Sequence, residues 1–71
     1  MAQLYYYNFA EIDPETNMCI GVETTTSEAH GDLPNMVAIP VYDEEYIFKY
    51  YINGEWYEDA AGTIPWTSSL I

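Results

Sequence analysis

The first third of the chain contains two stretches of strand-like composition separated by a turn. Residues 3–12 (QLYYYNFAEI) are rich in Tyr and Phe, and residues 18–26 (MCIGVETTT) carry Ile, Val and Thr. Aromatic and β-branched residues of this kind favour strands. Asp13 and Pro14 have the side chains preferred at the first two positions of a type I turn. The pattern therefore predicts an antiparallel hairpin.

The middle of the chain predicts a loop followed by a short strand. Residues 27–35 (SEAHGDLPN) contain Gly, Pro and Asn and interrupt the apolar pattern. Residues 36–41 (MVAIPV) form a short apolar run in which Pro40 lacks the N–H that a ladder hydrogen bond requires. We expect this run to be an edge strand or the end of one. Residues 42–45 (YDEE) are expected to form either one helical turn or a charged connector.

The clearest local signal is the pair Asn53-Gly54 within the aromatic-rich residues 46–58 (YIFKYYINGEWYE). A type I′ turn needs positive φ at both central residues, which Asn and Gly adopt readily. A two-residue turn here predicts four cross-strand pairs: Ile52 with Glu55, Tyr51 with Trp56, Tyr50 with Tyr57, and Lys49 with Glu58. Side-chain alternation places the pairs Tyr51–Trp56 and Lys49–Glu58 on one face, and Phe48, Tyr50, Ile52 and Tyr57 on the other. The only Lys or Arg of the chain should thus meet a carboxylate across the strands.

The last residues have no periodic pattern. Residues 60–62 (AAG) predict a turn, and residues 63–71 (TIPWTSSLI) favour an extended form because of their Thr and Pro content. We expect residues 63–71 to be an arm that packs on a neighbouring subunit, with packing across its own sheet as the alternative. The fold class predicted is all-β: residues 1–62 form one small antiparallel sheet of about four to five strands built from two hairpins.

The length and the charge limit how this protein is stabilised and what it binds. A chain of 71 residues is too short for a large core, and domains of this size often depend on disulfides, metals or partners. Cys19 is the only cysteine, so no disulfide forms within the chain. The net charge of -11 opposes binding to nucleic acid and to membranes. The sequence has neither a signal-peptide pattern nor an apolar run long enough to span a bilayer.

Three candidate chemistries are weak. Asp13, Glu15 and Asn17 resemble the start of a calcium loop, but Met18 and Thr24 stand where Gly and Glu are required. Cys19 and His30 are single residues far apart in the sequence, and neither a zinc site nor a nucleophile–base pair is indicated. A carboxylate pair would need a cleft that so small a chain has little room to form. We therefore expect no enzyme activity, cofactor, metal or small-molecule substrate.

The aromatic side chains are the strongest candidates for a functional surface. Tyr and Trp are favoured anchors of protein interfaces, and the first predicted strand is apolar on both of its faces. A self-covered core is the alternative to a partner. The residues expected to bind a protein partner or further copies of the chain are Tyr5, Tyr7, Phe9, Tyr51, Trp56, Trp66 and Leu70.

The acidic residues suggest a second role. The groups at 43–45 and at 55–59 could imitate phosphates and occupy the nucleic-acid groove of a basic protein, or they could form a solvated rim that keeps an aromatic protein soluble.

The order of these segments resembles a known class. The aromatic opening LYYYNFAEID, the later CIGV and IPV segments and the ending KYYINGEWYEDAAGTIPW resemble small tail- or fibre-associated proteins of tailed bacteriophages. The resemblance implies a virion or tail component made in the host cytoplasm, which assembles with other proteins. The alternative is an acidic phage-encoded inhibitor of a host defence or nucleic-acid-binding protein, which would act in the host cytoplasm.

Overall fold

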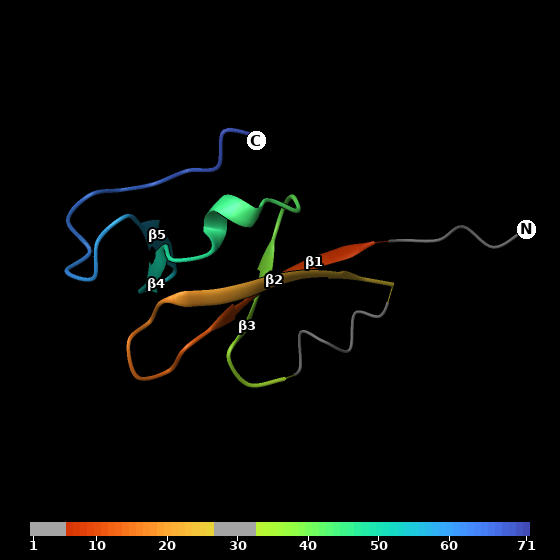
Figure 1. Ribbon diagram of the computed structural model, residues 1–71, viewed down its shortest axis with the longest axis horizontal. Helices are drawn as coiled ribbons and strands as arrows, with labels where there is room; N and C mark the ends of the chain where they lie inside the picture. Colours follow the sequence, from red (N-terminus) through yellow and green to blue (C-terminus); the bar gives the residue numbers. More distant parts are fainter. Residues whose placement is uncertain (1–5, 27–32) are drawn as a thin grey trace, which may run out of the picture.

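The computed structural model describes residues 6–26 and 33–71, and these residues form strands with one short 3-10 helix. The elements are β1 (Tyr7–Ile12), β2 (Cys19–Thr25), β3 (Met36–Ile39), η2 (Glu44–Tyr46), β4 (Tyr50–Ile52) and β5 (Glu55–Tyr57). They make a three-stranded antiparallel sheet in the order β2-β1-β3 and a separate β4-β5 hairpin (Figure 1). The all-β prediction is confirmed.

The β1–β2 hairpin forms as predicted and its turn is stabilised by its own polar groups. The Asp13 carboxylate accepts the Glu15 amide at 3.0 Å, while the amide of Asn17 donates to the Asp13 carbonyl at 2.8 Å. Asn17 takes the left-handed conformation that closes the turn, at φ 65°. A register shift at Glu11/Ile12 then brings Ile12 opposite Cys19.

Strand β1 is central because β3 pairs along its second edge, with Ala10 opposite Val37 and Phe9 opposite Ala38. The amide of Ile12 extends this pairing by donating to the Asn35 carbonyl at 2.8 Å. Ala10 and Phe9 are successive residues that point to opposite faces of β1, and both are buried: Ala10 fully, and Phe9 with only 4% exposed. Of the two alternatives for the second face of this strand, a partner or a self-covered core, the structure shows the self-covered core at Phe9.

The β4–β5 hairpin has the predicted register, with Ile52 opposite Glu55, Tyr51 opposite Trp56 and Tyr50 opposite Tyr57. Its turn residues Asn53 and Gly54 both have positive φ, at 51° and 84°, as a type I′ turn requires. The ladder ends at Tyr50 and Tyr57, so the predicted Lys49–Glu58 pair lies outside it.

The residues before β4 depart from the predicted strand. Lys49 places its Nζ over the Trp66 ring, 5.2 Å from the ring centroid. The predicted face containing Phe48 is wrong, because Phe48 is outside the strand with a φ of 76°.

The core lies where the three-stranded sheet meets η2, the hairpin and the end of the chain. Its buried residues are Ala10, Ile12, Cys19, Ile39 and Tyr46, against which Val22, Val37, Tyr51, Trp56 and Trp66 pack. Tyr46 is at its centre, and its ring makes edge-on contacts with Trp56 and with Trp66, each at a centroid distance of 4.8 Å. Backbone hydrogen bonds from Cys19 N to Lys49 O and from Tyr51 N to Asn17 O tie the two sheets together.

Residues 63–68 pack on the protein's own chain, which is the alternative given above to an arm that binds a neighbour. Pro65 forms a bridge with Tyr57, and the amide of Trp66 donates to the Trp56 carbonyl at 3.0 Å. The buried Ser68 hydroxyl donates to the Asp43 carboxylate, which also accepts the Glu45 amide at 2.9 Å and so caps η2. In Figure 1 the tail (blue) runs from beside the β4–β5 hairpin back toward η2.

We predict that Gly54→Val lowers the free energy of unfolding by about 1–3 kcal/mol, the usual cost of a strained backbone site. A Cβ at Gly54 would meet no atom within 4 Å, so the whole effect comes from a β-branched residue at φ 84°. Chemical denaturation measures it. Gly21→Ala is the matched control, since its Cβ also has open space and its backbone is not left-handed. Equal stability of the two variants would contradict the assigned turn.

The docked tail gives a second prediction. Trp66→Ala should cost about 3 kcal/mol of unfolding free energy, because it removes a large ring packed on Tyr46. Leu70→Ala, four residues later and 60% exposed, should change it by no more than about 0.5 kcal/mol. A Trp66→Ala protein as stable as the Leu70→Ala protein would show that the tail does not contribute to the core.

Candidate protein-binding surface

The structure separates the predicted partner-binding residues into three groups. Tyr51, Trp56 and Trp66 are half-buried and pack on the core of their own chain, and Phe9 is buried. Tyr7 is half-buried in β1, and Leu70 is exposed beyond the docked part of the tail. Tyr5 lies outside the described residues. The internal packing accounts for most of these side chains without a partner, and they do not form one continuous patch.

Other large apolar side chains are left exposed. Within residues 6–26 and 33–71 they are Tyr6, Ile20, Leu33, Tyr42, Phe48, Ile64, Leu70 and Ile71. Of these, Phe48 is 69% exposed and has the most unusual backbone. Positive φ is rare for a bulky residue, and such outliers are found where the surrounding structure holds them in place.

Two backbone hydrogen bonds hold Phe48 in this conformation. Its amide donates to the Cys19 carbonyl at 2.8 Å, and the next amide, of Lys49, donates to the Tyr46 carbonyl at 2.9 Å. The chain therefore turns sharply between η2 and β4 while it is fastened to the start of β2. No residue type in the segment YIFKYY signals this turn, because the segment has the composition of a continuous strand.

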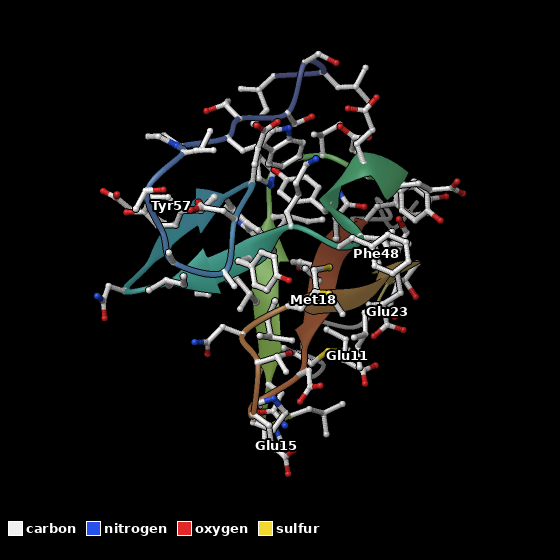
Figure 2. All side chains as sticks on the ribbon, turned by 60° about the vertical axis from the view of Figure 1, so that its left-hand side comes forward. Glu11, Glu15, Met18, Glu23, Phe48 and Tyr57 are labelled. Carbon is white, nitrogen blue, oxygen red and sulfur yellow. The ribbon has the colours of Figure 1, made fainter. Side chains whose placement is uncertain are left out.

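Ile20, the second residue of β2, is also exposed, at 48%. Ile20 follows Cys19, and the Cys19 carbonyl accepts the Phe48 amide. The backbone of Ile20 therefore lies next to that of Phe48. In Figure 2, Phe48 and Glu23 lie on one side of the molecule and Tyr57 lies on the opposite side. We call Ile20 and Phe48 the junction pair.

The carboxylates divide into structural and exposed groups. Asp13, Asp43 and Asp59 each accept backbone amides within turns or at a helix cap. Among residues 6–26 and 33–71, six glutamates are exposed: Glu11, Glu15, Glu44, Glu45, Glu55 and Glu58. Glu44 and Glu45 belong to η2, which packs against β2. The single Lys of the chain is engaged with the Trp66 ring. The described surface therefore exposes both carboxylates and large apolar side chains.

Sites for metals or reactive groups have little support in the described part of the chain. No group of three or more His, Cys, Asp or Glu side chains there is placed to hold a metal ion. Cys19 is fully buried, and burial raises the pKa of its thiol, which disfavours the reactive thiolate. His30 lies outside the described residues.

The pockets found on residues 6–26 and 33–71 are shallow. One of about 130 Å³ is lined by Glu11, Gly21, Val22 and Glu23, and one of about 290 Å³ by Glu11, Leu33, Pro34, Asn35 and Met36. None of the described helices is long and apolar enough to cross a membrane.

No protein-family model matches this chain, and no curated protein or solved structure is significantly similar to it. Its function has to be inferred from the chemistry of its own surface.

The turn that starts the docked tail generates a pH prediction. Asp59 Oδ1 accepts the amides of Thr63 and Ile64, each at 2.9 Å, and the Thr63 hydroxyl donates to Oδ2. The hydroxyl bond first, and then the amide bonds, lower the pKa of the Asp59 carboxyl below its ordinary value. The stabilisation from this carboxylate is therefore complete above the unfolded-state pKa of about 3.9 and is lost as the pH falls through the lower folded-state pKa.

An NMR titration of the side-chain carboxyl carbons measures this directly. Asp59 should titrate below an ordinary Asp, and the isosteric Thr63→Val should move its midpoint upward by removing the hydroxyl donor. A midpoint at the ordinary value, or one that Thr63→Val leaves unchanged, would contradict the assignment.

Proposed function

We propose that this protein is a non-enzymatic binding subunit that docks on another protein, as an accessory or structural component of a bacteriophage virion or tail. One observation carries the proposal. The chain fills its core with its own Tyr and Trp rings, yet it leaves apolar side chains such as Phe48 and Ile20 exposed on an acidic surface. Large apolar side chains that a small protein has no internal use for are typical of docking sites.

The virion assignment rests on the resemblance of the sequence to small tail- or fibre-associated phage proteins. The segments that carry it, LYYYNFAEID and KYYINGEWYEDAAGTIPW, include β1 and the β4–β5 hairpin. A protein of this kind is made in the host cytoplasm and then incorporated into the particle. Its charge of -11 makes a different protein a better partner than further copies of itself, since like charges repel.

One observation favours a second candidate, an acidic inhibitor that occupies a basic groove on a nucleic-acid-binding or defence protein of the host. The only Lys stacks on Trp66, whereas the glutamates of η2 and of the β5 region are exposed. Their charges are available to a basic partner, as the phosphates of a nucleic acid would be.

Mass spectrometry of purified particles, from a lysate of the phage encoding this chain, tests the proposal. The chain should be present in fixed proportion to the major tail proteins and should remain after washing in about 1 M salt. The Debye length is then only about 3 Å, so contacts between charges are screened while apolar contacts persist.

Two results would count against the virion role. Absence of the chain from intact particles would overturn it. Recovery of the chain from infected cells in a complex with a host protein, released by the same salt, would favour the inhibitor instead.

A further inference from the structure

Phe48 combines a strained backbone with an exposed ring, and the isolated protein gains little from either. The side chain of Phe48 is 69% exposed, and its backbone has a φ of 76°. The two hydrogen bonds that shape the turn use the backbone amides of Phe48 and Lys49, so they do not need a phenyl group. Asn or Gly would adopt the same conformation at lower cost. A role for the ring outside its own fold explains its presence.

The surroundings of Phe48 define the partner it suits. Ile20, the other residue of the junction pair, follows Cys19, whose carbonyl accepts the Phe48 amide, and both side chains are exposed. Acidic side chains come shortly before Phe48 in the chain: Glu44 and Glu45 of η2 are exposed, and the Glu44 carbonyl accepts the amide of Ile47, the residue before Phe48. Glu23 of β2 is labelled on the same side of the molecule as Phe48 in Figure 2. An apolar centre with a charged border is the usual arrangement of a protein interface.

We propose that Phe48, with Ile20 beside it, is the anchor that enters an apolar socket on a partner protein whose border carries Lys and Arg. This inference rests on the proposed docking function and specifies its site and the chemistry of its partner. Charge complementarity selects the occupant. A basic border would face the exposed Glu44 and Glu45, whereas a second copy of this chain would bring two acidic surfaces together.

The first test is the stability of Phe48→Asn in the full-length chain. Asn tolerates positive φ, so the variant should melt at the wild-type temperature or above it. Phe48→Gly is the second variant, and it removes the strain completely. Ile64→Asn is the matched control, because Ile64 is also an exposed apolar residue, at 50%, but lies in the tail. A clear loss of thermal stability in both Phe48 variants would overturn the proposal by showing that the ring supports the fold.

The second test is binding to two synthetic peptides of equal length and charge, one alternating Lys with Leu and one alternating Lys with Ser. In ¹H–¹⁵N spectra the Lys-Leu peptide should bind more tightly and should perturb the amides of Ile20, Glu23 and Phe48. Phe48→Asn should weaken that binding at least about tenfold, as expected for an interface anchor. Ile64→Asn should bind as the wild type does.

The contrary outcomes are distinct. The proposal that Phe48 is the anchor would be overturned if the two peptides bind equally and Phe48→Asn does not change their binding. It would also be overturned if neither peptide binds. Light scattering of the wild type in about 1 M salt tests whether a second copy of the chain is the partner. Self-association that Phe48→Asn abolishes would show that it is, and would overturn the proposed basic partner. Detection of the chain in phage particles does not depend on these results, so the docking function and its anchor can fail separately.

Discussion

The contact of Tyr46 with two tryptophan rings is the interaction on which the rest of this structure depends. Trp56 comes from the β4–β5 hairpin and Trp66 from the tail, and both meet the same tyrosine edge-on at 4.8 Å. Tyr46 itself is buried among side chains of the three-stranded sheet. A two-stranded hairpin is only marginally stable alone. Here it is stable because one ring joins the sheet, the hairpin and the tail, and edge-to-face geometry adds to the burial of apolar area.

Polar groups fix the elements around this contact. Asp43 caps the short helix that carries Tyr46 and also accepts the Ser68 hydroxyl, so one carboxylate positions both the tyrosine and the end of the docked tail. Asp59 organises the turn from which the tail starts. Lys49 places its ammonium group over the ring of Trp66. In this small acidic protein, several charged residues thus have structural roles, whereas Glu44 and Glu45 remain exposed.

The packing also changes which residues are candidates for function. Aromatic residues that a sequence reading assigns to a partner surface, such as Trp56 and Trp66, complete the protein's own core. Phe48, which the pattern assigned to a strand face, is exposed instead, at a turn held by the Cys19 carbonyl. A docking surface built on a fixed turn is preorganised, so little conformational entropy is lost when it binds. This rigidity, together with the acidic surface, is the physical basis of the proposed binding role.

The sequence by itself determined the features that depend on a few consecutive residues. Asn53-Gly54 set the turn and the register of the second hairpin, and Asp13-Pro14 set the turn of the first, because backbone preferences act locally. The all-β class followed from composition for the same reason. Only the tertiary structure decided that β3 pairs with β1, that Trp66 docks on Tyr46, and that Phe48 turns outward. These features depend on contacts between residues that are far apart in the chain. The sequence alone does not distinguish an aromatic side chain that is buried in its own core from one that is buried by a partner.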